Sequence, residues 1–303
     1  IPNFEKEFGI RIRYAVYESN EEMLAKVMSG NSGWDVVFPS NSYIRPMRDQ
    51  GLLTPLRRER LTNLDFLDAQ FRSPSWDPKL EWCVPYMWGA TGIAYNRELS
   101  PPPTSWTSLW GERLKGRLTM LDDAAEVIGA CLKKLGFSFN SEDASELQLA
   151  RREAIAQKPL LRAYLNAEVR DQLVAGDVLA AHLWGTTAQQ AIDASDSLGF
   201  HYPSEGFPLY ADNAVILRES RRSELAHLFI NYLLRPEVSA AVANATKTAT
   251  ANAGAWALLP ESLRNNRTLY PTSEDLERGE WWETPPPAIQ RLRDRLWTEI
   301  KSA

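Results

Sequence analysis

The sequence predicts an α/β protein with two lobes, each a mixed, mainly parallel sheet flanked by helices, joined by crossover strands. Three observations lead to this prediction. The chain has 303 residues, more than a single hydrophobic core comfortably accommodates. Its first fifty residues alternate strand-like and helix-like patterns, as parallel sheets covered by helices do. The uncharged run at residues 82–96 (WCVPYMWGATGIAYN) is too long for an ordinary strand and contains glycines, as expected where a strand crosses between lobes.

The N-terminal segment supplies the alternation. In order, we expect a helix ending at residues 4–8, a half-buried strand at 11–16, a helix from the caps at 18–20 to Met28, a fully buried strand at 34–38, and a helix from the turn at 39–42 to Gln50.

The later segments continue the same pattern. We expect a short helix at 105–110, a strand at 117–121, a helix at 123–135, a polar helix-rich segment to 175, a buried strand at 178–183, a helix near 188, a second crossover strand at 212–217, two helices within 219–245 broken at Pro236, and a tail helix from Ala288.

Two crossings make each lobe discontinuous. We place the first lobe at residues 1–89 plus 212–256, and the second at residues 90–211 plus 257–303. A ligand cleft is expected where the lobes face each other.

The composition narrows the function. Hydrophobic residues make up 44% of the chain, and no run approaches the roughly 18 apolar residues that a membrane span requires. The net charge of −5 disfavours a nucleic-acid surface and mildly favours a cationic ligand. The chain opens abruptly, without a charged and apolar leader, so we expect that upstream residues precede it.

The residues that most often bind metals or form disulfides are scattered. Cys83 and Cys131 fit no zinc or redox motif, and we expect two buried thiols without a disulfide. His182, His201 and His227 are far apart in sequence, and we expect surface or core roles for them. We therefore predict no cofactor and no metal.

Seven motifs follow one another along the chain: YESNE (17–21), WDVVFPS (34–40), PYMWGATGIAYN (85–96), LDDAAEV (121–127), INYLLRPEV (230–238), TLYP (268–271) and GEW (279–281). In their order and spacing they resemble the periplasmic spermidine/putrescine-binding proteins of bacterial ABC importers. The resemblance covers nearly the whole chain and implies the two-lobed type II periplasmic binding protein fold, with ligand closure by hinge motion.

The resemblance implies three acidic ligand-binding residues. Asp123 and Glu126 lie three residues apart, on one face of a helix, and match two of the family's acids. The same Asp-x-x-Glu pattern is also a helix-capping box, and we assign the capping or solvated role to Asp122. Asp212 matches the acid of the family's Trp-x-Asp-Ser motif; as an alternative, it is a turn acid before a strand. Each ammonium of a buried polyamine needs such an acid.

The resemblance also implies aromatic walls for the methylenes of a polyamine. Trp184 matches the wall residue after a buried strand, where α/β ligand sites lie, although a core role is its alternative. Tyr210 stands where the family commonly has tryptophan. Ser40 matches a serine of the site, but it is also a possible helix cap. We expect Tyr86 and Trp88 to pack at the hinge.

Three positions depart from the family pattern and leave the preferred polyamine open. Ser42 replaces an aromatic residue, Thr248 replaces a tyrosine, and Trp282 replaces a glutamine. The family's N-terminal strand and its Trp-x-Glu-Tyr loop, which supplies a wall and an acid, would precede Ile1.

The resemblance thus predicts a monomeric, periplasmic or extracytoplasmic binding protein that delivers a polyamine to the membrane permease of an ABC importer. Other classes stay open. The ligand could be another organic amine or an amino acid, although no arginine stands beside the matched acids to bind an α-carboxylate. A sensor that retains the fold is a further alternative. An enzyme is disfavoured because the chain has no GxSxG, P-loop, GxGxxG, HExxH or paired CxxC motif.

Overall fold

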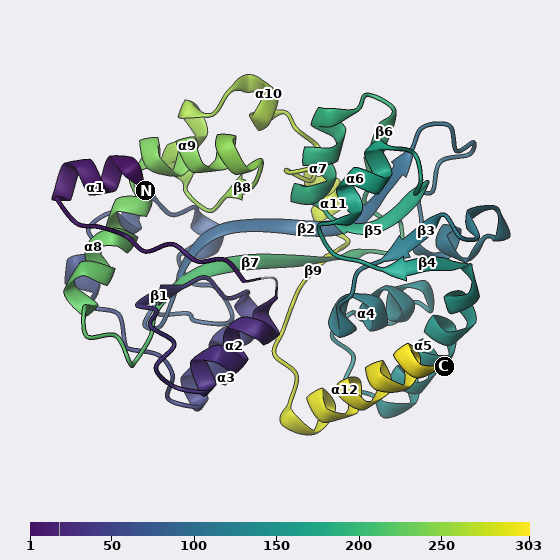
Figure 1. The fold of residues 1–303 in the computed structure, drawn as a ribbon, viewed down its shortest axis with the longest axis horizontal. Coiled ribbons are helices and arrows are strands. Elements are labelled where there is room, and N and C mark those ends of the chain that lie inside the picture. The colour runs from purple at the N-terminus through teal and green to yellow at the C-terminus, as the bar shows by residue number, and fades with distance from the viewer. Residues whose placement is uncertain (18) are drawn as a thin grey trace. The chain divides into compact units, whose positions relative to one another are not determined.

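A computed structural model describes residues 1–17 and 19–303 and divides them into two compact units (Figure 1). Unit 1 comprises Ile1–Trp88 and Ala211–Arg264, and unit 2 comprises Gly89–Tyr210 and Asn265–Ala303. Two long strands, β2 (Val84–Asn96) and β7 (Phe207–Ile216), each begin in one unit and end in the other. Glu18, which we predicted to help cap a helix, lies outside the described residues.

Unit 1 is mainly helical around short strands. The strand β1 (Val36–Val37) pairs antiparallel with the end of β7, and β8 (Ala249–Thr250) pairs antiparallel with the start of β2. Its helices are α1 (Pro2–Phe8), α2 (Asn20–Met28), α3 (Asn41–Asp49), α8 (Ser223–Leu233), α9 (Pro236–Thr246) and α10 (Glu261–Arg264), with 3₁₀ turns η1 (Arg58–Arg60), η2 (Leu64–Phe66), η3 (Ala69–Phe71) and η7 (Ala253–Leu258).

Two strand predictions in unit 1 need correction. Residues 11–16 form no strand; Tyr14 and Val16 are 74% and 68% exposed, because no described strand pairs with this segment to cover one face. The predicted buried strand at 34–38 reduces to the two residues of β1, which pairs with β7. Alternating or apolar residues predict a strand only where a neighbour completes its hydrogen bonds.

Unit 2 is built on a mixed sheet. The strand β3 (Leu118–Met120) runs parallel to β4 (Leu161–Tyr164) and β5 (Ala180–Trp184). Both β5 and β6 (Leu198–His201) pair antiparallel with the second half of β2. The strand β9 (Gly279–Trp281) runs parallel to the start of β7. Strands β4 and β6 were not predicted: β4 lies in the segment expected to be polar and helix-rich, and β6 is only four residues long and follows the polar residues 195–197 directly.

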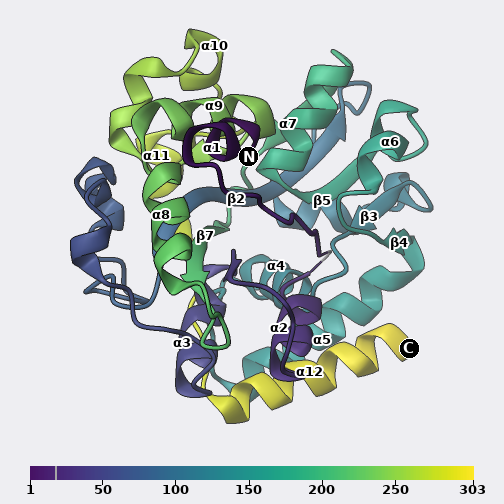
Figure 2. The ribbon, with the colours of Figure 1, turned by 60° about the vertical axis from the view of Figure 1, so that its left-hand side comes forward.

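The helices of unit 2 flank this sheet. They are α4 (Ala124–Lys134), α5 (Ala144–Gln157), α6 (Val169–Val174), α7 (Gly185–Ala194), α11 (Ser273–Leu276) and α12 (Pro287–Ser302), with 3₁₀ turns η4 (Trp106–Trp110), η5 (Glu112–Leu114) and η6 (Lys158–Leu160). The C-terminal helix α12 lies alongside α5 (Figure 2). Helices on a mixed sheet confirm the predicted α/β fold class.

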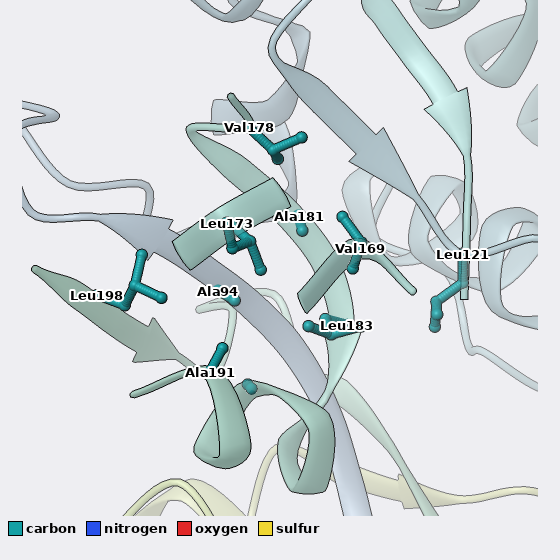
Figure 3. Packing of buried hydrophobic residues seen from close by; sticks show 10 residues of the cluster. Ala94, Leu121, Val169, Leu173, Val178, Ala181, Leu183, Ala191 and Leu198 are labelled. Atoms are coloured by element: carbon teal, nitrogen blue, oxygen red, sulfur yellow. The ribbon is translucent and has the colours of Figure 1, made fainter. Parts of the chain in front are cut away.

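The apolar core of unit 2 covers one face of β5 and leaves the other face to polar side chains. Leu173 of α6 and Ala191 of α7 pack with Ala181 and Leu183 of β5 in one buried cluster (Figure 3). Because side chains alternate along a strand, His182 points to the opposite face of β5. That face is the one that Glu126 of α4 reaches.

The glycines of β2 lie against bulky neighbours. A Cβ on Gly92 would lie 2.6 Å from the carbonyl oxygen of His201 and from the ring of Phe200. A Cβ on Gly89 would lie 2.6 Å from the hydroxyl oxygen of Tyr210. Both glycines therefore admit close neighbours while β2 continues as one strand.

Cys83 and Cys131 are buried free thiols, which confirms the prediction made for the two cysteines.

No helix among the described residues is long and apolar enough to cross a membrane.

The packing of α4 gives a first testable prediction. A Cβ on Gly129 would lie 2.2 Å from the ring of Phe139, which is fully buried. We expect Gly129→Ala to lower the free energy of unfolding by about 1–3 kcal/mol through overpacking, measured by chemical denaturation. Gly111→Ala is the matched control, because its nearest neighbour is 3.5 Å away and its φ of −82° suits alanine. Equal effects of the two substitutions would contradict this packing.

Candidate functional site

The candidate residues fall into two groups, one in each unit. Unit 1 contains Ser40, Ser42, Asp212 and Thr248, and unit 2 contains Asp123, Glu126, Trp184, Tyr210 and Trp282.

In unit 1 the structure brings Ser40 and Asp212 together. The two residues form an isolated antiparallel bridge, and the Ser40 hydroxyl donates to Oδ1 of Asp212 over 3.2 Å. Asn20 holds Ser40 in place: its amide nitrogen donates to the Ser40 hydroxyl, and its amide oxygen accepts from the Ser40 backbone, both at 3.0 Å. The start of α2, the start of α3 and the middle of β7 therefore share one polar network.

The geometry separates the two predicted roles of Ser40. Ser40 occupies the N-cap position of α3, but its side chain makes no capping hydrogen bond. Its hydroxyl is directed to the Asp212 carboxylate instead. Helix capping therefore does not explain this serine.

Two tyrosines lie within the electrostatic reach of Asp212. Burial raises the pKa of Tyr17 to about 12, and the negative charge of Asp212 adds to that increase. Burial also raises the pKa of Tyr86, again with a contribution from Asp212. The ring of Tyr86 packs on Phe38 at 5.1 Å, and the Phe38 backbone N–H donates to the Tyr17 hydroxyl over 3.1 Å.

Neither tyrosine was among the predicted site residues. Tyr86 was expected to pack at the hinge, and Tyr17 was assigned no role beyond its motif. The only available signal was that both tyrosines belong to the strings that carry the family resemblance.

The Asp212 carboxyl is electrostatically unfavourable where it lies. Burial raises its pKa from 3.8 to about 6, and the hydrogen bond from Ser40 only partly opposes this. Among the described residues, the side chain that donates a hydrogen bond to Asp212 is the Ser40 hydroxyl, not a cationic group. The negative charge of the ionised carboxylate is therefore poorly compensated at neutral pH. Such a group would be stabilised by a positively charged ligand.

The other two candidates of unit 1 have different surroundings. Ser42 is half-buried in the first turn of α3. Thr248 is buried, and its hydroxyl donates to the Met87 sulfur over 2.9 Å and bonds the Thr246 hydroxyl over 2.8 Å. Where the resemblance implies a tyrosine, the chain therefore presents a threonine held against a methionine of β2.

In unit 2, Asp123 is the N-cap of α4. Its Oδ1 accepts from the backbone N–H groups of Ala125 and Glu126 over 2.8 and 3.0 Å. Of the two roles that we assigned to Asp122, the capping role belongs to Asp123, and the solvated role is the one that Asp122 has. Asp122 is exposed and forms an ion pair with Lys301. Only an acid directly before the first helical residue can reach those N–H groups.

Glu126 is held inside unit 2. Its side chain is 4% exposed, and its two oxygens have separate partners. The Thr91 hydroxyl donates to Oε1 over 2.8 Å, and Nε2 of His182 lies 3.3 Å from Oε2. His182 itself is fully buried. A surface or core role was expected for His182, and its pairing with a candidate ligand-binding acid was not predicted.

Three candidates of unit 2 converge on one short part of β2. Trp184 pairs with Thr91 across the β2–β5 ladder, and Thr91 also bonds Glu126. Tyr210 lies against Gly89, two residues earlier on β2. Glu126 and Tyr210 thus meet this stretch through their side chains, whereas the partly buried ring of Trp184 packs against the apolar cluster that contains Leu183, in agreement with its alternative core role.

Trp282 is held by different neighbours. Its ring packs edge-on against Phe139 at 4.5 Å, and the guanidinium of Arg293 lies 5.7 Å from it. Its backbone N–H donates to the carbonyl of Leu209 over 2.9 Å, which ties it to the residue before Tyr210. The Trp282 ring thus packs against Phe139 and Arg293, neither of which was predicted to belong to the site.

These side chains are suited to binding a cation. They offer carboxylates and aromatic rings, and the described residues contain no group of three His, Cys, Asp or Glu side chains able to hold a metal. The remaining histidines are engaged elsewhere: His201 stacks on Tyr95, and His227 accepts from the Arg57 backbone N–H.

Comparison with known proteins identifies the class. Residues 1–266 match the model of the bacterial extracellular solute-binding protein family, so the chain belongs to that family. The resemblance inferred from the sequence motifs is thereby confirmed.

Individual relatives have names that are more specific than that of the family. An Escherichia coli protein named spermidine/putrescine-binding periplasmic protein is 35% identical over 305 residues, covering all of this chain and 87% of its own. A solved structure from Listeria monocytogenes matches with a TM-score of 0.95 and 32% identity, covering 99% of this chain and 94% of its own. A spermidine/putrescine ABC transporter substrate-binding protein from Streptococcus pneumoniae matches with a TM-score of 0.87 and 29% identity, at the same coverage.

The raised pKa of Asp212 gives a second testable prediction. In the unliganded protein the folded-state pKa lies above the usual value of 3.8, so ionisation destabilises the fold as pH rises from about 4 through 6. Asn mimics the protonated side chain. We therefore expect Asp212→Asn to raise the free energy of unfolding by about 1–2 kcal/mol at pH 8 and much less at pH 4. Chemical denaturation at both pH values measures the change in the free energy of unfolding. Ser29→Ala, a substitution at an exposed position, is the control. A variant less stable than the parent at pH 8 would contradict it.

Proposed function

We propose that this protein captures a polyamine and delivers it to the membrane permease of an ABC importer. The observation that carries the proposal is the Asp212 carboxylate, whose ionised form is disfavoured by burial and which lies near two tyrosines. An ammonium group would neutralise the carboxylate, and the aromatic faces would add a cation–π attraction of about 0.5–2 kcal/mol. The names of the relatives support a polyamine as the source of that ammonium.

Both units contribute to holding the ligand in this proposal. Asp212, supported by Ser40, neutralises one ammonium, and Asp123 and Glu126 supply negative charge in unit 2. Trp184 and Tyr210 line the methylenes, since both lie beside the same stretch of β2. Ser42, Thr248 and Trp282 adjust the shape of the site. In this proposal the two discontinuous units, which β2 and β7 connect, are the two lobes of the binding protein.

The competing functions receive less support. An amino acid would require an arginine for its α-carboxylate, whereas the hydrogen-bonding partners of Asp212 and Glu126 are hydroxyl and imidazole groups. The family and the relatives are binding proteins rather than enzymes, which supports a binding role without catalysis. We infer a location outside the cytoplasm from the same relatives, and we expect a monomer.

Charge-removing substitutions test the proposal. We expect Asp212→Asn to weaken binding of putrescine or spermidine about tenfold or more, because an ammonium loses its carboxylate partner. Asp123→Asn should weaken binding too, and asparagine preserves the helix cap, so the fold is retained. Isothermal titration of ligand-free protein measures both affinities.

The adjacent acid provides the control for this experiment. Asp122→Asn removes the same charge from an exposed side chain that pairs with Lys301, and it should change affinity less than threefold. If all three variants bound like the parent protein, the site assignment would be wrong. If no polyamine bound the parent protein, the proposed function itself would be wrong.

A further inference from the structure

Two buried asparagines flank the polar pair of unit 1. Asn41 directly follows Ser40 in the chain, and Asn213 directly follows Asp212. Both asparagines are fully buried, whereas Ser40 and Asp212 between them keep some exposure. A buried side-chain amide costs free energy unless its donors and its acceptor find partners. Neither asparagine was among the predicted site residues, and the partners of each amide show what it does.

The two asparagines lie where the pairing of β1 with β7 ends in the site. The strands β1 and β7 pair antiparallel, and the bridge between Ser40 and Asp212 continues that ladder in the same register. Between them, the backbone N–H of Asn213 donates to the carbonyl of Pro39 over 2.9 Å. On this register the next opposing pair is Asn41 with Ala211, the residue before Asp212.

At that pair, the side chain of Asn41 replaces a backbone acceptor. The chain turns into α3 at Asn41, so the backbone carbonyl of this residue points along the helix and not across the ladder. The side-chain oxygen of Asn41 instead accepts from the backbone N–H of Ala211 over 3.0 Å. Ala211 is fully buried, and its N–H would otherwise lose this partner. Asn41 therefore fixes the backbone directly before Asp212.

Asn213 fixes the backbone on the other side. Its Nδ2 donates to the carbonyl of Ala211 over 2.7 Å and lies 3.5 Å from the carbonyl of Pro39. Its Oδ1 accepts from the indole N–H of Trp76 over 3.0 Å and from the thiol of Cys83 over 3.4 Å. This amide thus ties β7 both to the turn before α3 and to the segment that leads into β2.

We propose that Asn41 and Asn213 are positioning residues that hold the backbone on both sides of Asp212 in the geometry that meets a ligand ammonium. Through the backbone they keep the Asp212 carboxylate against the Ser40 hydroxyl. This inference rests on the proposed function. An acid that is held in its binding geometry before the ligand arrives binds more tightly, because less conformational freedom is lost on association.

The test measures putrescine binding by isothermal titration of the ligand-free protein at pH 8, above the pKa of about 6 of Asp212. We expect Asn41→Ala and Asn213→Ala each to weaken binding about fivefold or more, because the freed carboxylate must be ordered on binding. Asn252→Ala is the matched control. Asn252 is also buried in unit 1, but its amide nitrogen donates to Leu234 and Ser239. This control should change the affinity less than about twofold.

A double-mutant cycle with Asp212→Asn distinguishes positioning from a general structural effect. If the two asparagines act through the carboxylate, each alanine substitution should weaken binding less than about twofold once the carboxylate is absent. Damage to the fold would instead weaken binding equally in both backgrounds. Thermal denaturation shows whether each variant is folded. If an alanine variant does not fold, Asn41→Ser or Asn213→Ser, which keeps a smaller polar side chain, replaces it in the same cycle.

The outcomes separate this inference from the proposed function. If neither putrescine nor spermidine binds the parent protein, the proposed function is wrong and the inference falls with it. If putrescine binds and Asp212→Asn weakens it, the proposed function stands. The positioning role is then wrong if the variants of Asn41 and Asn213 bind like Asn252→Ala, or if they weaken binding equally with and without the carboxylate.

Discussion

The ionised Asp212 carboxylate is the constraint on which the rest of the binding unit depends. Burial raises its pKa to about 6, so at neutral pH the protein carries a charge that its own side chains compensate incompletely. The surrounding structure holds this charge in place: β7 positions it, Ser40 donates to it, and Asn20 fixes Ser40. The ligand-free protein would therefore be more stable at neutral pH with a neutral side chain at position 212. A cationic ligand would offset the free-energy cost of the buried, ionised carboxylate.

In unit 2, by contrast, the candidate acids have stabilising partners within the protein. Asp123 is stabilised by the N-terminus of α4, and Glu126 is satisfied by Thr91 and His182. Its rings lie beside a glycine-containing stretch of β2, where Tyr210 can approach the backbone. Asp212 is thus the acid whose ionised form the protein compensates least, because burial raises its pKa.

The sequence predicted the fold class and most elements where local pattern and tertiary packing agree, as in the long strand β2 and the helix at Ala124–Lys134. It failed at residues 11–16, because an alternating pattern does not show whether a neighbouring strand is available to pair. For the site, the motifs pointed to Asp123, Glu126 and Asp212, but could not show which of them are already engaged. The pairing of Glu126 with His182 links residues 56 positions apart, on a helix and a strand, and has no local signature.

The most direct test of a ligand ammonium meeting Asp212 is the proton release that accompanies binding. Titrations of putrescine near pH 6, in two buffers with different ionisation enthalpies, count the protons lost when the ammonium lowers the pKa of Asp212. We predict a release of about half a proton near pH 6 that disappears at pH 8 and in Asp212→Asn. Binding heats that do not depend on the buffer, or an equal release in Asp212→Asn, would contradict the central role of this carboxylate.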